Sequence, residues 1–252
     1  MTNEYLNNYE IKNFFLKFFL KFFLFFFAKY DIMKCKNVDY FIANSNFIRK
    51  RIKKIYNRNS KVIYPSININ NYKYKYKKKN FFLTSSRLVP YKKIDLIINA
   101  FNLMPEHKLI VCGDGPCYKD FKKFAKKNIE LKGWVSDKKL REYLSNANAF
   151  IFAALEDFGI IPIEAMASGT PVIALNAGGT KETISVKSKN NLCGELFKKQ
   201  NINSIIMAVK KFERKRKIYK SHNCRIKSKN FSNENFHIQF QAFISSKINQ
   251  IR

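Results

Sequence analysis

Two glutamates, Glu156 and Glu164, stand eight positions apart in the segment EDFGIIPIEAMASGTPVIALNAGG, residues 156–179. An ionised carboxylate accepts hydrogen bonds and donates none, so two of them suit a ligand that carries several hydroxyl groups. Glu164 lies about one turn inside a predicted helix, on the face that it shares with Ile160 and Ser168. The alternative interpretation is that the first glutamate is a solvated loop acid and the second an ordinary helix acid.

A helix is predicted to begin between these two glutamates. Gly159 starts it, and Pro162 fits the first turn because the amide that proline lacks would have no partner there. The first amides of a helix have no partner within it and lie at the positive end of the helix dipole. Both features favour the binding of a phosphate there. A sugar on one side of that phosphate and a ribose on the other would bring hydroxyl groups to both glutamates. The amides of this predicted phosphate site belong to Phe158, Gly159, Ile160 and Ile161.

The segment SSRLVPYKK, residues 85–93, supplies two cations. Arg87 follows a predicted strand and Lys92 opens the next helix, so both face the same ligand space. Two cations opposite a helix N-terminus form a clamp for a diphosphate. A solvated surface position is the alternative for any single lysine of this lysine-rich chain. It is weaker for Arg87, because only nine of the 48 basic residues are arginine.

Short apolar segments alternate with amphipathic helices from Phe81 onward. This alternation is typical of βαβ units and predicts an α/β fold, with a parallel sheet covered by helices on both faces. The predicted strands are 81–86, 107–113, 129–133, 148–154 and 171–175. The predicted helices are 92–104, 117–127, 137–147, one from Gly159, a short one from Thr180, one over 201–219 and one from Ser232.

Ligands of such sheets bind outside the carboxyl ends of the strands, so the turns that follow the strands line one crevice. Besides the loop of Glu156 and the NAGG loop, two turns qualify. GDGP contains Gly113, although this motif alone could be a simple turn. LKGWV contains Gly133, Trp134 and Val135, where backbone and ring could flank a nucleobase, with plain packing as the alternative for the tryptophan.

The composition limits the classes of function. The formal net charge is +30. Lysine, asparagine, isoleucine, phenylalanine and tyrosine are over-used together, so the charge reflects a general bias of the amino-acid composition and does not favour nucleic-acid binding. No DxD motif or metal-ligand cluster occurs, so no metal and no cofactor are expected. The three histidines lie outside the motifs. Five cysteines without a CxxC pair predict free thiols in a reducing compartment, hence a cytoplasmic protein.

The segment NFFLKFFLKFFLFFFAKY, residues 13–30, complicates this localisation. Its uninterrupted apolar run, residues 22–28, is far shorter than the roughly 20 residues that span a bilayer. Two interpretations stay open: a helix packed on a neighbouring layer, or an interfacial helix whose lysines reach the headgroups on the cytoplasmic face of a membrane.

These motifs together resemble the retaining glycosyltransferases of family 4. EDFGIIPIEAMASGTPVIA is similar to the E-x7-E signature, and SRLVPYKKIDLIINAFN, GDGP and GGTKETI follow in the expected order and spacing. The sequence is most similar to the branch that transfers mannose from GDP-mannose in three segments: SRLVPYKKIDL, FAALEDFGIIPIEAMASGTPVIA and the upstream VDYFIANSNFIRKRI. Leu155 and the LNAGG loop depart from that branch, which puts the identity of the sugar in doubt.

The resemblance implies a GT-B fold, with two Rossmann-like domains, and a metal-independent transfer from a nucleotide-sugar donor to a glycan or lipid-linked acceptor with retention of configuration. It implies that Glu156 contacts the hydroxyls of the donor sugar and Glu164 those of the nucleotide ribose. It also implies that Arg87 and Lys92 hold the diphosphate and stabilise the charge of the leaving group.

The expected domain organisation follows from the resemblance and from a segment without core-forming periodicity, NNYKYKYKKKN. Residues 1–69 are expected to be a remnant of the acceptor-side domain and 70–80 a linker. Residues 81–230 are expected to form the complete nucleotide-sugar domain, and 231–252 a helix that packs back towards the N-terminal part. Most of the acceptor domain is expected to be missing, so a separate N-terminal-half polypeptide is the expected partner. The alternative is a non-catalytic remnant that only binds the nucleotide-sugar.

Overall fold

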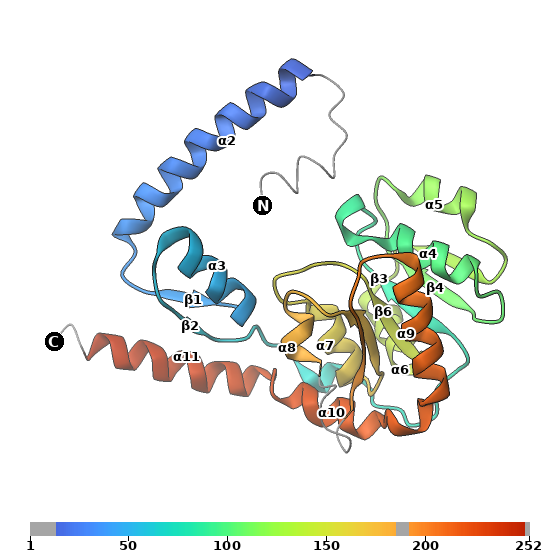
Figure 1. Cartoon of the computed structure of the whole chain (residues 1–252). Coiled ribbons are helices and arrows are strands. Elements are labelled where there is room, and N and C mark those ends of the chain that lie inside the picture. The colour runs from blue at the N-terminus through green and yellow to red at the C-terminus, as the bar shows by residue number, and fades with distance from the viewer. Residues whose placement is uncertain (1–13, 185–191, 250–252) are drawn as a thin grey trace. The chain divides into compact units, whose positions relative to one another are not determined.

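The computed structural model describes residues 14–184 and 192–249 (Figure 1). The chain divides into two compact units, Met1–Val62 and Ile63–Arg252. This division falls before the segment 70–80 that the sequence predicts as a linker, and Tyr72 of that segment is buried in the core of the second unit.

The second unit is built on one parallel sheet of six strands in the order β5-β4-β3-β6-β7-β8. The strands are β3 (Phe82–Ser85), β4 (Leu109–Cys112), β5 (Ile129–Gly133), β6 (Ala149–Phe152), β7 (Val172–Leu175) and β8 (Gly194–Phe197). The chain winds outward from β3 in one direction and from β6 in the other. The junction of these two neighbouring strands is therefore the point where the strand order reverses, and such folds bind their ligands there.

Helices cover both faces of this sheet, which confirms the predicted α/β architecture (Figure 1). On one face, α4 (Ile94–Asn102) packs against α9 (Ile202–Arg214), and α5 (Tyr118–Phe124) joins the same apolar cluster. On the other face, α7 (Ile160–Ala167) packs against α10 (Ser221–Lys229), beside α6 (Asp137–Asn146). The remaining helices of this unit are the short α8 (Thr180–Thr183) and α11 (Asn233–Ile248).

The apolar patterns explain these two layers. On α9 the buried side chains are Ile205, Ala208, Val209 and Phe212, spaced three or four positions apart, so one stripe of the helix faces the sheet. The four residues of β3 are all buried, as are those of β4, β6 and β7, because helices lie above and below them.

The sequence did not predict two elements of this unit. Strand β8 completes the sheet beside β7, and helix α10 lies within the segment left unassigned between the predicted helices. The helix predicted over 201–219 ends at Arg214, and a 3-10 turn, η4 (Arg216–Ile218), leads into α10.

The first unit contains the long helix α2 (Phe14–Lys34) and a small β-α-β arrangement. Strands β1 (Phe41–Ala43) and β2 (Ser60–Val62) pair in parallel, with α3 (Asn46–Tyr56) between them in sequence. Ser45 caps α3, since its hydroxyl accepts a hydrogen bond of 3.1 Å from the amide of Ile48. None of the helices in the described part of the chain combines the length and the hydropathy that crossing a bilayer requires.

Candidate functional site

Arg87 lies just past the carboxyl end of β3, at the point where the strand order reverses. The backbone on both sides of it is fixed: the amide of Ser86 donates to the carbonyl of Cys112 at 3.2 Å, and that of Leu88 to Asp114 at 2.9 Å. The Arg87 side chain itself is exposed and forms no hydrogen bond or ion pair with any described residue. The fold therefore holds a guanidinium at the carboxyl end of β3 with all of its donors available.

Lys92 and Glu156 form an ion pair across the same point, one after β3 and the other after β6. Their side chains are 17% and 22% exposed, so the pair is partly shielded from water. Burial lowers the pKa of the Lys92 ammonium. The sequence assigned these two residues to different groups of one ligand and did not predict that they pair with each other.

The loop of Glu156 is held by the NAGG loop that follows β7. The amide of Gly179 donates to the carbonyl of Glu156 at 2.9 Å. A Cβ atom on Gly179 would lie 2.3 Å from Cα of Phe158, so only glycine allows this approach. Phe158 is buried and stacks on Tyr64 with ring centroids 5.8 Å apart. These contacts fix the backbone between Glu156 and helix α7.

Helix α7 begins where the sequence predicts. Gly159 precedes it with φ +84°, a conformation that favours glycine, and Pro162 is buried in the first turn. Among the described residues, the amides of Phe158, Gly159 and Ile160 find no backbone acceptor, as expected for a helix start. The side chain of Ile160 is 45% exposed, whereas that of Ile161 is half-buried. Free amides and the positive end of the dipole therefore lie together at the start of α7, after the loop of Glu156.

Glu164 lies further along α7 and is half-buried. The hydroxyl of Tyr72 donates a hydrogen bond of 2.6 Å to its Oε1. Burial raises the pKa of Glu164, whereas the Tyr72 hydrogen bond acts in the opposite direction. Burial, followed by the same hydrogen bond, raises the pKa of the Tyr72 hydroxyl, so the tyrosine stays a neutral donor. Tyr72 could not be predicted as a site residue, because an alternating tyrosine–lysine segment gives no signal of a buried contact.

The turns after β4 and β5 lie at the same edge of the sheet, where the carboxyl ends of the strands meet. The amide of Gly113 donates to the carbonyl of Gly133 at 2.7 Å, and Gly113 has φ +127°. A Cβ atom on Gly113 would lie 1.9 Å from the carbonyl oxygen of Ser86, so three successive turns share one packed backbone. Trp134 is 76% exposed, and Val135 packs at the edge of the core. The tryptophan ring is thus available for stacking.

The structure therefore brings the predicted residues to one edge of one sheet. Within the described residues there is no group of three or more histidine, cysteine, aspartate or glutamate side chains that could hold a metal ion. The positive groups at this edge are Arg87, Lys92 and the start of α7, and the carboxylates beside them are Glu156 and Glu164. Cations between carboxylates suit an anion whose two ends carry hydroxyl groups.

Comparison with known proteins gives this arrangement a context. The family model described as glycosyl transferases group 1 matches residues 66–231, which is more than half of the chain. An O-antigen chain mannosyltransferase of Salmonella typhimurium is 32% identical over 157 residues, covering 58% of this chain and 43% of its own length. The chain spans about half the length of the curated relatives that it matches.

Two solved structures share the fold at low sequence identity. Sucrose-phosphate synthase from Thermosynechococcus elongatus superposes with a TM-score of 0.76 and 19% identity, covering 88% of this chain and 62% of its own. HepE of Anabaena, in complex with UDP and glucose, superposes with a TM-score of 0.72 and 22% identity, covering 87% and 66%. The two-faced parallel sheet is that of the GT-B glycosyltransferases.

Proposed function

Because this chain belongs to the glycosyl transferases group 1 family, we propose that its second unit binds a nucleotide-sugar for a metal-independent, retaining glycosyl transfer. One observation carries the proposal. Arg87 and the Lys92–Glu156 pair lie at the strand switch point, before the free amides that open α7. A diphosphate between two cations and a helix N-terminus gains charge-assisted hydrogen bonds from all three.

The ion pair suggests how the donor is received. In the proposed complex the Lys92 ammonium turns from Glu156 to the diphosphate, and Glu156 is left to accept hydrogen bonds from the sugar hydroxyls. Lys92 and Arg87 then stabilise the negative charge that grows on the departing diphosphate. Glu164, one turn deeper, accepts from the ribose hydroxyls. The exposed Trp134 ring is proposed to stack on the base.

The identity of the donor is a finer proposal. GDP-mannose is the proposed donor. The sequences of the motifs support this proposal, as does a relative whose name is mannosyltransferase. The structural neighbour in complex with UDP and glucose makes UDP-glucose the proper competitor in any test. The acceptor is proposed to be a glycan or a lipid-linked sugar.

Calorimetric titration of the chain with GDP, UDP, GDP-mannose and UDP-glucose tests the donor proposal. Saturable binding of one nucleoside diphosphate and its sugar supports it, and no binding of any of the four would refute it. Binding without transfer or donor hydrolysis, even after addition of an acceptor-side polypeptide, would favour the alternative of a non-catalytic nucleotide-sugar-binding protein.

Glu156→Gln should separate the sugar from the diphosphate. Lys92 would no longer leave an ion pair, so GDP or UDP should bind roughly threefold more tightly. The advantage of the nucleotide-sugar over the bare diphosphate should fall about tenfold, because a charged acceptor for the sugar is lost. Titration of both ligands measures the two effects, and Glu106→Gln, at an exposed glutamate whose Oε1 lies 3.6 Å from His107 Nε2, is the control. Equal losses for both ligands would show that Glu156 does not face the sugar.

Tyr72→Phe should change the pH dependence of nucleotide binding. The Tyr72 hydroxyl stabilises the carboxylate form of Glu164, so its loss should raise the pKa of Glu164 further. Affinity is expected to fall as the pH drops through that pKa, and in the variant the fall should begin at higher pH. Pyrophosphate titrated in parallel corrects for protonation of the phosphates themselves. A corrected profile unchanged by the substitution would separate Glu164 from ligand binding.

Helix α2 is proposed to lie at a membrane surface, while its packing on another protein layer stays the alternative. Its side chains include Phe15, Phe18 and Phe27, which are 82%, 65% and 66% exposed, and exposed lysines at 21, 29 and 34. Apolar rings with flanking cations suit a bilayer that contains anionic lipid. The chain should sediment together with phosphatidylglycerol vesicles, and deletion of residues 13–28 should abolish this co-sedimentation. Retention by purely zwitterionic vesicles alone would contradict the electrostatic part.

A further inference from the structure

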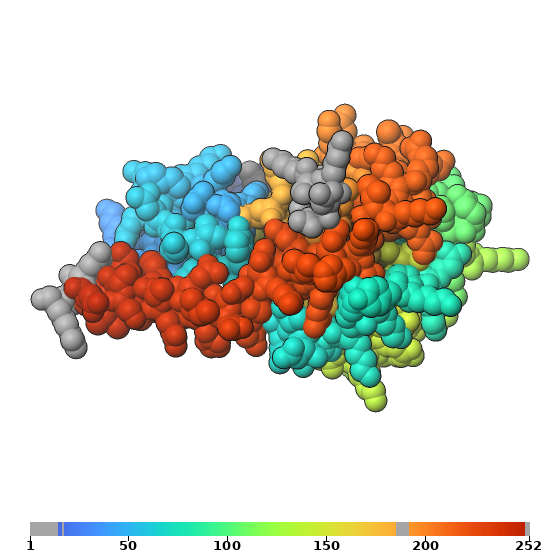
Figure 2. All heavy atoms as spheres, turned by 90° about the horizontal axis from the view of Figure 1, so that it is seen from below, coloured from blue at the N-terminus to red at the C-terminus, as the bar shows by residue number. Residues whose placement is uncertain are grey.

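A concave site lies at the amino ends of the strands, opposite the edge where the donor is proposed to bind. A cavity of about 350 Å³ opens beside Asn148 and Pro171, the residues that directly precede β6 and β7. Arg87 and Glu156 follow the carboxyl ends of β3 and β6, so the length of a strand, roughly 13 Å for four residues, separates the two edges. This cavity therefore does not belong to the donor crevice. Its walls come from the segment around residues 76–78 and from the η4–α10 region, which lie side by side in Figure 2.

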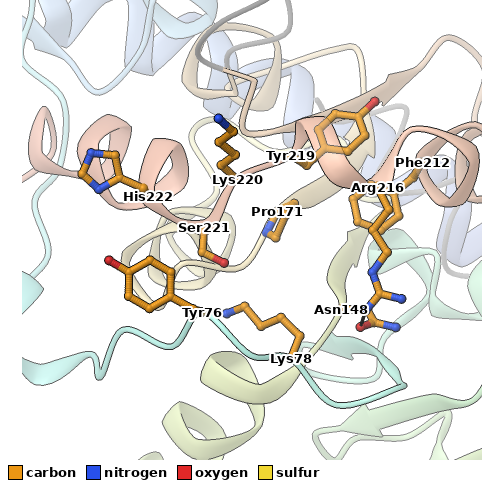
Figure 3. Close-up of a pocket in the computed structure, with 10 residues that line it drawn as sticks. All are labelled: Tyr76, Lys78, Asn148, Pro171, Phe212, Arg216, Tyr219, Lys220, Ser221 and His222. Atoms are coloured by element: carbon orange, nitrogen blue, oxygen red, sulfur yellow. Dashed lines mark hydrogen bonds between the residues drawn. The ribbon is translucent and has the colours of Figure 1, made fainter.

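The lining of this amino-edge cavity is cationic. The cations Lys78, Arg216 and Lys220 line it, and none of its ten lining residues is an aspartate or a glutamate. Figure 3 shows the Lys78 side chain between Tyr76 and the Arg216–Asn148 pair, with Ser221 and Pro171 beside it. In a chain of net charge +30 a basic surface is ordinary, but a basic concavity without an acid concentrates positive potential.

The charge of Lys78 has no counter-charge in the described part of the chain. Its ammonium donates to the carbonyls of Ser145 and Ser168 at 3.0 and 3.1 Å and to Thr170 Oγ1 at 2.9 Å, all neutral acceptors. Burial lowers the pKa of Lys78 to about 8, and the neighbouring Lys75 acts in the same direction. A half-buried ammonium that meets only neutral groups is costly, and an anion in the cavity would offset that cost.

The other groups around the cavity can contact an anion directly. The Arg216 guanidinium donates to Asn148 Oδ1, and its nearest carboxylate, that of Glu213, is 3.9 Å away. The Lys220 side chain is exposed. Helix α10 begins at Ser221, and no side chain caps it, so its first amides and its dipole add to the positive potential.

We infer that this amino-edge cavity binds a small dianion of the phosphate-monoester class, apart from the donor crevice. The Arg216 fork and the start of α10 would hold the phosphoryl oxygens, Lys220 would close over them, and Lys78 would supply charge from below. A volume of about 350 Å³ exceeds one phosphate and leaves room for a small hydroxylated body beside Tyr76 and His222.

Inorganic phosphate is the probe for the test, titrated calorimetrically into the full chain at constant ionic strength. The donor crevice would also attract phosphate, so the same titration is run on Arg87→Gln. A saturable site should survive in Arg87→Gln and weaken at least tenfold in Arg216→Gln/Lys220→Gln, which loses two charged donors. Amide resonances of Ser221 and His222 should shift on titration in a ¹H–¹⁵N spectrum.

Lys217→Gln, a neighbouring exposed lysine outside the cavity lining, is the matched control for charge and should keep the affinity. If Arg216→Gln perturbs folding, Lys220→Gln alone still tests the site, because that side chain is exposed. The inference fails if phosphate binding is lost in Arg87→Gln, if Lys217→Gln weakens it as much as Lys220→Gln, or if no saturable binding occurs. Failure of nucleotide binding at the other edge would leave these outcomes unchanged.

Discussion

Replacing Arg87 by alanine is expected to weaken the binding of GDP or UDP about 100-fold while leaving the melting temperature unchanged. The guanidinium forms no hydrogen bond or ion pair with described residues, so its removal breaks no contact of the folded chain. It should, however, remove charge-assisted hydrogen bonds to the diphosphate worth roughly 1.5–3 kcal/mol, and about 2.7 kcal/mol corresponds to a 100-fold change. Isothermal calorimetry and thermal denaturation of the same preparation measure both quantities.

Arg214→Ala is the matched control for this prediction. Arg214 is also an exposed arginine of the second unit, on α9, so its loss changes the net charge equally. Should both variants lose affinity to the same extent, the effect would come from the general positive charge of the chain rather than from a clamp. An unchanged affinity in Arg87→Ala would remove the residue from the proposed site.

Those parts of the fold that depend on local pattern could be predicted from the sequence. The strands β4, β6 and β7 are continuous apolar segments, β3 begins with Phe82 and Leu83, and all four were placed within a few residues. Their parallel order brings Arg87, Glu156 and Gly113 to one edge without any knowledge of contacts. The start of α7 could also be predicted, because a glycine followed three positions later by a proline is typical of a helix start, as with Gly159 and Pro162.

Features that depend on distant contacts could not be predicted. Strand β8 carries Glu195 in its middle, which argues against a buried strand. The structure resolves this with Lys211, 2.6 Å from one carboxylate oxygen, and with the Tyr219 hydroxyl, 2.7 Å from the other. The segment 70–80 looks like a linker for the same reason. Tyr72 and Lys78 form hydrogen bonds with partners about 90 positions away, and a local pattern does not show these partners.

The ion pair of Lys92 and Glu156 shows a further limit of the sequence. Each residue was assigned to the ligand from its position after a strand, and nothing in the spacing indicates that the two meet. Their pairing matters for the energetics, because a ligand must exchange one charged contact for another. The net gain from Lys92 is therefore expected to be smaller than that from Arg87, which gives up no such contact.

Glu164→Gln is expected to weaken nucleoside diphosphates by about 30-fold and pyrophosphate by less than about twofold, since only the former carry a ribose. The substitution keeps the size of the side chain and an oxygen that can accept from Tyr72, whose bond to Glu164 is 2.6 Å long. It removes the negative charge that makes this residue the stronger acceptor for hydroxyl groups.

The comparison of two ligands makes this prediction specific to the ribose. A general distortion of α7 would disturb the amides at its start and weaken pyrophosphate as well, whereas loss of a ribose contact would not. A 2′,3′-dideoxynucleoside diphosphate, which lacks both hydroxyls, should bind wild type and Glu164→Gln equally. If that analogue discriminates between the two proteins, or if pyrophosphate weakens in parallel with the nucleotides, then Glu164 supports the helix rather than the ligand. Equal binding of the analogue, together with selective weakening of the nucleoside diphosphates, would instead place the ribose beside Glu164. This position is one turn along α7, on the far side of the phosphate from Glu156.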